Sequence, residues 1–151
     1  MDESRVCELY ERFKDGIFRY ILSLTGDSHL AEDVLQETFV RLLRANKIPD
    51  TGKEQAWLYK VARNRCFDML RKRRRQEEPA EIVINKPDDS FEFFELISPL
   101  SEKEREIVSL RFVGGFTHTQ IARIMGTTVA ATKKRYERAI KKLRDSEDNY
   151  D

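Results

Sequence analysis

The sequence is poor in residues that interrupt helices and in residues that cross-link chains. Its 151 residues include only six glycines, four prolines and two cysteines. The cysteines, Cys7 and Cys66, are too few for a disulfide framework, which favours a reducing, cytoplasmic location. A run of about 18 apolar residues is also lacking, so neither a transmembrane helix nor membrane insertion is expected. The acidic N-terminal stretch has no apolar core and is not typical of a signal peptide.

An excess of charge of one sign is lacking too, because 28 basic and 27 acidic residues leave a net charge of +1. The charges are nevertheless unevenly distributed. Residues 60–75 hold eight Lys or Arg and residues 128–144 hold seven, with one acid in each segment, whereas residues 76–99 hold seven acids and one lysine. One basic run alone would indicate a solvated helix face. Two of them, on either side of an acidic segment, favour a polyanionic partner.

Apolar residues recur with the helical period along most of the chain and strand-like alternation is scarce, which predicts an all-α fold. The first helix should end at Gly26, and Asp27 or Ser28 should cap the second. A third helix is predicted from about Glu54 to Arg73. The second helix is expected to bury Leu30, Val34, Leu35, Phe39, Leu42 and Leu43.

The composition divides the chain into two small helical domains. Residues 1–75 contain the three-helix unit. Residues 76–90, with two prolines and several acids, are interpreted as a flexible acidic linker. Residues 91–151 are expected to form the second domain, which begins with a short helix at 91–97.

The second domain carries the signature of a helix-turn-helix. Ser101 with Glu104, and Thr117 with Gln120, have the spacing of capping boxes, each of which opens a helix. Gly126 interrupts the apolar run after the second box, and either of the two threonines that follow can cap a final helix. Two helices joined by a short turn that contains glycine form a helix-turn-helix, and the glycine permits a positive φ there.

The final helix separates into an apolar and a cationic side at 100° per residue. The apolar side holds Val129, Thr132, Tyr136, Ala139, Ile140 and Leu143. The opposite side holds Ala130, Ala131, Lys134, Arg138 and Lys141, with Arg135 and Lys142 beside it. Small residues followed by long cations suit a recognition helix in a major groove. The alternative is an ordinary amphipathic terminal helix with a charged face.

Three motifs occur in the order found in one family. Residues 29–43 read HLAEDVLQETFVRLL, residues 57–64 read WLYKVARN and precede a basic run at 71–75, and residues 100–143 span the helix-turn-helix. On these motifs the chain resembles the extracytoplasmic-function (ECF) sigma factors of the sigma-70 family. These are the promoter-recognition subunits of bacterial RNA polymerase, and the resemblance covers nearly the whole chain.

The resemblance implies how the chain would bind core polymerase. Asp33, Gln36 and Glu37 match the positions that dock on the β′ clamp coiled coil, and the resemblance also implies a contact with the β flap. These three residues lie on the predicted solvent face of their helix. The alternatives are a solvated acidic face or a metal site that includes His29. Adjacent carboxylates do not converge on an ion, so no metal and no cofactor are expected.

The resemblance also implies two promoter contacts. The minus-ten element would be opened and bound by the loop 46–55 together with Lys60, Arg63, Asn64, Arg71, Arg73 and Arg74. The duplex minus-thirty-five element would be read by Lys133, Lys134, Arg135 and Arg138. Trp57 and Tyr59 are candidates for base stacking, although Trp57 fits a core position better. The cations at 71–75 can lie along phosphates or complement the helix macrodipole.

The sequence departs from the family pattern at the start of the last helix, where Ala130, Ala131 and Thr132 replace the usual Gly-Thr-Val, and at Glu54, where the family usually has an aromatic residue. The family further implies an anti-sigma factor as a partner. Two other classes remain open. A stand-alone helix-turn-helix repressor or activator should dimerise on a two-fold operator. An enzyme, such as a nuclease using Glu32, Asp33 and Glu37, would need a metal cluster or a nucleophile–base pair; no such set is found, so no catalytic residue is expected.

Overall fold

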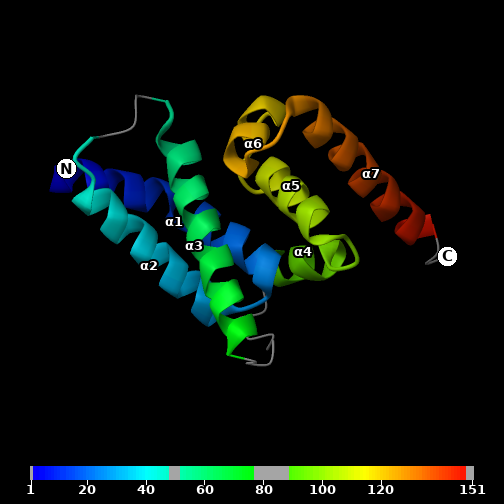
Figure 1. Cartoon of the computed structure of the whole chain (residues 1–151), viewed down its shortest axis with the longest axis horizontal. Helices are drawn as coiled ribbons and strands as arrows, with labels where there is room; N and C mark the ends of the chain where they lie inside the picture. The colour runs from blue at the N-terminus through cyan, green and yellow to red at the C-terminus, as the bar shows by residue number, and fades with distance from the viewer. Residues whose placement is uncertain (1, 48–51, 77–88, 149–151) are drawn as a thin grey trace.

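The structure, a computed structural model, describes residues 2–47, 52–76 and 89–148 (Figure 1). Within these ranges every regular element is an α-helix, as predicted. The helices are α1 (Glu3–Thr25), α2 (Ser28–Arg44), α3 (Glu54–Arg75), α4 (Asp89–Ile97), α5 (Glu102–Phe112), α6 (His118–Met125) and α7 (Val129–Asp148). Figure 1 shows α1–α3 as one unit and α4–α7 as a second unit beside it.

The predicted junction between the first two helices is confirmed. Gly26 ends α1 with a φ of 67°, and its N–H donates to the carbonyl of Leu22. Asp27 then caps α2, because its Oδ1 accepts from the N–H of Leu30 at 3.1 Å. An L-residue with a side chain is strained at such a φ, so glycine allows the chain to reverse within two residues.

Two predicted boundaries shift. Helix α3 continues to Arg75, two residues past the predicted end. Helix α4 begins at Asp89, inside the predicted linker and two residues before the predicted short helix. The greater part of that linker, residues 77–88, lies outside the described residues.

The buried face of α2 follows the predicted apolar period with two exceptions. Leu30, Val34 and Leu42 are fully buried. Leu43, which was expected on the inner face, is 45% exposed and that prediction was wrong; Leu35 is only half-buried. Leu42 already fills the inward position at this turn of α2, and its neighbour is rotated 100° away from the core.

Both units contribute to one continuous core, which the division into two domains did not predict. Ile107, Leu110, Phe116, Ile121 and Ile124 from the second unit belong to the same buried cluster as the first unit's core. A smaller cluster, formed by Ile97, Leu100, Val108 and Ala139, lies wholly within the second unit. The two helical domains are therefore packed against each other in this structure.

The two cysteines differ sharply in environment. Cys66 is fully buried in α3, and this burial raises the pKa of its thiol to about 12, whereas Cys7 is exposed on α1. Because the thiolate is the reactive form, we expect a thiol reagent at neutral pH to modify one cysteine per folded chain and both after denaturation. Rapid modification of both in the folded chain would contradict the burial of Cys66.

Candidate nucleic-acid interface

Both predicted capping boxes are present in the helix-turn-helix unit. The Ser101 hydroxyl accepts from the N–H of Glu104 at 3.3 Å, and the Glu104 carboxylate accepts from the N–H of Ser101 at 3.0 Å. Thr117 and Gln120 form the equivalent pair at the start of α6. Gly126 adopts the predicted positive φ, 69°, at the turn. These local bonds fix where α5 and α6 start.

The inward side of α7 matches the prediction. Thr132 and Ala139 are buried, and the Thr132 hydroxyl donates to the carbonyl of Thr128 at 2.9 Å. The Tyr136 ring meets His118 of α6 edge-on, with ring centroids 5.0 Å apart. The helix is therefore anchored along one side, which leaves its opposite side to solvent.

Three of the four residues predicted to read the duplex are exposed to solvent. Lys133, Lys134 and Arg138 are exposed, and Arg135 is half-buried beside a pocket. Lys142 is bound within the domain instead, since its Nζ lies 2.7 Å from Oε1 of Glu104. Burial opposes ionisation of Glu104, but Lys142 and Ser101 outweigh it and hold the pKa of this carboxyl below its usual range.

The cations of α3 differ in how far they are already engaged. Lys60 and Asn64 are exposed, and exposed Arg71 pairs with Asp68 one turn away. Arg73 donates to Asp27 at 2.9 Å, where that carboxylate caps α2. Arg73 thus ties α3 to α2, a role that sequence reasoning missed; an acidic N-cap within reach of a basic helix end was the available signal.

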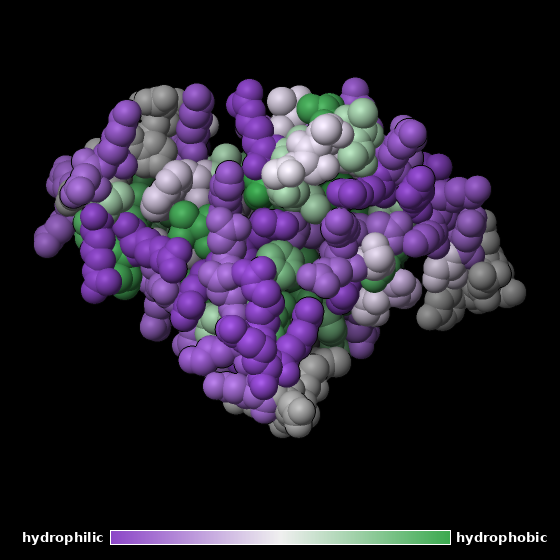
Figure 2. Space-filling view, in the orientation of Figure 1, coloured by the Kyte–Doolittle hydropathy of each residue, from purple (hydrophilic) through white to green (hydrophobic). Residues whose placement is uncertain are grey.

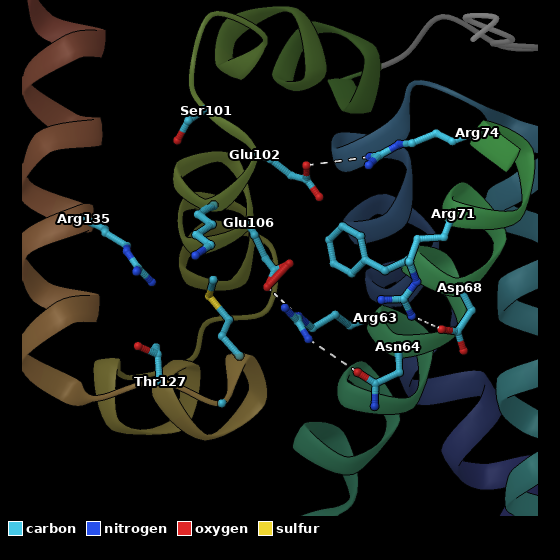
Figure 3. Close-up of a pocket in the computed structure, with 14 residues that line it drawn as sticks. Arg63, Asn64, Asp68, Arg71, Arg74, Ser101, Glu102, Glu106, Thr127 and Arg135 are labelled. Atoms are coloured by element: carbon cyan, nitrogen blue, oxygen red, sulfur yellow. Dashed lines mark hydrogen bonds and ion pairs between the residues drawn. The ribbon is translucent and has the colours of Figure 1, made fainter. Parts of the chain in front are cut away.

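Arg63 points across the boundary between the two units. Its Nε donates to Oε1 of Glu106 on α5 at 2.6 Å, and the Glu106 side chain is only 2% exposed (Figure 3). Desolvation dominates at this carboxyl and raises the pKa of Glu106 even though Arg63 lowers it. Figure 3 shows Arg63 and Asn64 on one wall of a pocket and Arg135 on the other. The pocket has a volume of about 900 Å³.

The two candidate stacking residues are not equivalent. Tyr59 is 1% exposed and packs edge-to-face on Phe116, with ring centroids 5.0 Å apart. Its burial raises the pKa of the phenol to about 12. In this arrangement Tyr59 is a core residue and is closed to a base. Trp57 is half-buried against the core, as the core interpretation expected.

The predicted loop 46–55 is described only in part, since residues 48–51 lie outside the described residues. Its end is fixed by Glu54, which accepts from the N–H of Gly52 at 2.8 Å and from Arg5 at 2.8 Å. Hydrogen bonds from its own backbone, from Gly52 and from Arg5 outweigh burial and lower the pKa of Glu54. The acid therefore anchors the loop to α1.

The solvent face of α2 combines polar and apolar side chains. Asp33 and Gln36 are exposed, whereas Glu37 is half-buried between Arg41 and Arg65. Val40 and Leu43, 38% and 45% exposed, continue the face of Gln36 at helical spacing. This exposed apolar stripe was not foreseen. Hydrophilic side chains cover much of the molecular face in Figure 2.

The metal-site and nuclease alternatives gain no support from the side chains described. His29 is exposed at the start of α2, apart from any converging ligands. Among the residues that the structure describes, no group of three or more His, Cys, Asp or Glu could hold an ion. The same residues include no helix long and apolar enough to cross a membrane.

The chain is similar to proteins of one family along nearly its whole length. The Sigma-70 region 2 model matches residues 9–76, and the Sigma-70, region 4 model matches residues 90–143. The ECF RNA polymerase sigma factor SigM of Bacillus subtilis is 30% identical over 149 residues, which cover 91% of each chain. SigL of Mycobacterium tuberculosis, also an ECF sigma factor, is 32% identical over 152 residues, covering 90% of this chain and 85% of SigL.

Two solved structures share the fold. The sigma factor RpoE of Bartonella quintana, in complex with the anti-sigma factor NepR, superposes with a TM-score of 0.79 at 23% identity, covering 91% of this chain and 93% of RpoE. CnrH, in complex with the cytosolic domain of CnrY, gives a TM-score of 0.77 at 22% identity, covering 98% of this chain and 90% of CnrH.

The fold consists of two packed helical units, and the last helix of the second unit presents a cationic face. These features define a helix-turn-helix protein. The two region models and the relatives specify the class further. The chain belongs to the sigma-70 family and is an ECF sigma factor of RNA polymerase. The alternative of a stand-alone repressor or activator is not favoured, because the first unit is itself a sigma region.

Proposed function

We propose that the chain brings core polymerase to its promoters through three separate surfaces and has no chemistry of its own. The face of α2 around Asp33 and Gln36 docks on the β′ clamp coiled coil, and Glu37 acts at its edge because Arg41 and Arg65 already bind it. The exposed apolar stripe at Val40 suits a helical partner better than solvent does. The second domain, for which we propose the bounds 91–151 extended to the start of α4 at Asp89, contacts the β flap.

The α7 face is proposed to hold the duplex minus-thirty-five element. The observation that carries the proposal is the exposure of Lys134 and Arg138 opposite the anchored side of the helix, with Lys133 exposed as well. Arg135, at the edge of this face, is assigned to the phosphate backbone. Long cations after two small residues can reach base edges while the helix lies deep in the groove.

The α3 face is proposed to capture the unpaired strand at minus-ten. Lys60, Asn64 and Arg71 are exposed along it and offer cations for phosphates and an amide for an extruded base. Arg63 and Arg74 belong to the same face. Arg73 is retained as a weaker candidate, since its guanidinium binds Asp27. Binding the open strand better than the duplex shifts the equilibrium towards the open complex.

An anti-sigma factor is proposed as the regulatory partner, and the cytoplasm as the site of action. The structures of RpoE and CnrH support this partner, because each was solved with NepR or CnrY bound. We expect this chain to co-purify with a partner that blocks transcription by the chain. Removal of the partner should restore transcription.

Asn64→Ala tests the strand-capture role. We expect the variant to form closed promoter complexes normally and to reduce open complexes about tenfold, since a good bidentate hydrogen-bonded contact with a base is worth about 1–3 kcal/mol. Permanganate reactivity of unpaired thymines measures the opening. Gln76→Ala, which removes another exposed amide at the end of α3, is the matched control. Equal loss in closed and open complexes would contradict a role in strand capture.

A further inference from the structure

The first turn of α3 is held by a buried carboxylate that belongs to the turn itself. The N-cap residue, Lys53, makes no capping hydrogen bond from its side chain, because a lysine side chain has no acceptor. Glu54 supplies the acceptor instead. Its Oε2 accepts from the N–H of Gly52 at 2.8 Å, and its Oε1 accepts from Nη2 of Arg5 at 2.8 Å. The carboxylate therefore joins the segment before α3, the start of α3 and α1.

Burial makes this carboxylate depend on its donors. Glu54 is only 8% exposed, and a buried charge is costly unless it is paired and hydrogen-bonded. The pKa of Glu54 is nevertheless lowered, first by a hydrogen bond from its own backbone N–H and then by those from Gly52 and Arg5. Donors on α1, on the preceding segment and on α3 thus hold the ionised carboxylate in one orientation.

Arg5 is a firm anchor because the helix around it is packed into the core. Val6 and Leu9, 5% and 1% exposed, fix the first turns of α1. The guanidinium is also held by Glu8, whose Oε1 lies 3.0 Å from Nη1. Arg5 therefore donates to Glu54, 49 positions further along the chain, from a fixed place on another helix.

The bond to Gly52 controls how the chain enters α3. Gly52 has a φ of 92°, which residues with a side chain rarely adopt, so the backbone conformation at this entry depends on glycine. Residues 46–55, which the family resemblance assigns to the minus-ten element, end here. Lys60 of the proposed strand-capture face follows Glu54 by about 9 Å along the helix, at about 1.5 Å per residue. The entry to α3 therefore adjoins the surface proposed to hold the minus-ten strand.

We propose that Arg5 and Glu54 are positioning residues for minus-ten recognition, because they hold the first turn of α3 in the place from which residues 46–55 select a base. This inference rests on the proposed function and adds to it two residues that are assigned no contact with DNA. The body of α3 does not depend on the pair, because Leu58 and Ala62 are fully buried in the core. Loss of the pair should loosen the entry to α3 and leave the rest of the fold intact.

Promoter discrimination tests this role in Arg5→Ala, which removes the ion pair and leaves the bond from Gly52 to Glu54. Permanganate reactivity of holoenzyme complexes is compared on a promoter that the parent chain transcribes and on its single-base variants at either element. We expect the preference for the original minus-ten sequence to fall about fivefold, as for the net loss of one hydrogen bond. The preference for the original minus-thirty-five sequence should not change.

A pair that only stabilised the fold would give a different result. Less folded chain, or weaker binding to polymerase, lowers transcription from every promoter alike and leaves both preferences as they are in the parent. Unchanged minus-ten preference in Arg5→Ala would therefore overturn the positioning role, and so would an equal fall in both preferences.

Glu54→Gln tests the pair from its other end. Glutamine has nearly the same size but one acceptor oxygen where the carboxylate has two, so it cannot accept from Gly52 and Arg5 through separate oxygens. The minus-ten preference should fall at least as far as in Arg5→Ala. The double variant should lose no more than Glu54→Gln alone, because both changes break one interaction. Fully additive losses would show that the two residues act independently, which contradicts the inference.

Three further variants test the role of the charge on α1. Arg5→Lys keeps the charge without the planar guanidinium and should recover part of the preference that Arg5→Ala loses; no recovery would contradict an ion pair. Glu8→Gln removes the other partner of Arg5 at a side chain that is 64% exposed. Arg12→Ala removes an exposed arginine further along α1. Both controls should keep the minus-ten preference of the parent, and circular dichroism verifies that all variants are helical.

Amide hydrogen exchange of the free chain tests the geometry without a promoter. The N–H of Gly52 should exchange about fivefold faster in Arg5→Ala, because the acceptor that protects it is then less firmly held, whereas that of Ala62 in the body of α3 should keep its parent rate. Unchanged exchange at Gly52 would show that the pair does not hold the entry to α3 and would overturn the inference.

The outcomes separate the inference from the function on which it rests. A parent chain that supports no transcription with core polymerase would overturn the proposed function, whatever the exchange rates are. A parent chain that transcribes, with the same minus-ten preference in parent and Arg5→Ala, would overturn the positioning role and leave the proposed function intact.

Discussion

Replacing Asp33 and Gln36 together by lysine is expected to weaken binding to core polymerase by about 2 kcal/mol or more, about thirtyfold in Kd. The change reverses the charge of Asp33 and adds a charge at Gln36, which is strongly unfavourable at a complementary interface. Both side chains are exposed on α2. Glu37 is left in place because its replacement would also break its ion pairs with Arg41 and Arg65. A loss of polymerase binding could then not be separated from a loss of packing. Fluorescence anisotropy of labelled chain titrated with core polymerase measures the affinity.

The fold should be unaffected, because exposed substitutions away from such contacts change stability by about 0.5 kcal/mol or less. Glu11→Lys on α1 is the control for added positive charge, as its ion pair with Lys14 is a surface one. Unchanged affinity in the double variant, with the fold intact, would remove α2 from the polymerase interface.

Arg138→Ala is expected to cost about 1–3 kcal/mol of promoter binding, between about fivefold and 150-fold, if its guanidinium reads a base edge. The side chain is exposed on α7, past the two alanines at the start of the helix. The loss should concern one position of the minus-thirty-five element. Promoters that are already altered at that position should therefore bind the variant and the parent with similar affinity. Holoenzyme binding to a set of single-base promoter variants measures this pattern.

Arg144→Ala, an exposed arginine further along α7, is the matched control and should have a smaller effect. A loss at Arg138 that is equal on every promoter variant, with a reduced dependence on salt, would reassign this residue to the phosphate backbone. No loss at all would place α7 outside the DNA interface.

Local signals in the sequence were sufficient for the helices and for those helix ends that a glycine or a capping residue marks. The hydrogen bonds that start or end these helices join residues only a few positions apart, as at Gly26, Asp27, the two capping boxes and Gly126. Such roles can be predicted without knowing the tertiary fold. The cationic side of α7 followed from helical geometry in the same way.

Contacts between residues distant in sequence could not be predicted from these local patterns. The partnership of Arg63 with Glu106, 43 positions away, and the burial of Tyr59 under Phe116 depend on how two independently predicted units pack. Leu43 was misassigned because apolar character alone does not distinguish an inward residue from one kept for a partner. The functional assignment of individual site residues came from the family resemblance and stays a prediction.

Run-off transcription from a genomic promoter library, with core polymerase and with or without the chain, tests the central proposal most directly. The proposal predicts transcripts that depend on the chain and start downstream of a shared pair of sequence elements. It also predicts weak binding of the free chain to the same promoters. An absence of chain-dependent transcripts, together with tight and specific DNA binding by a dimer of the chain alone, would contradict it.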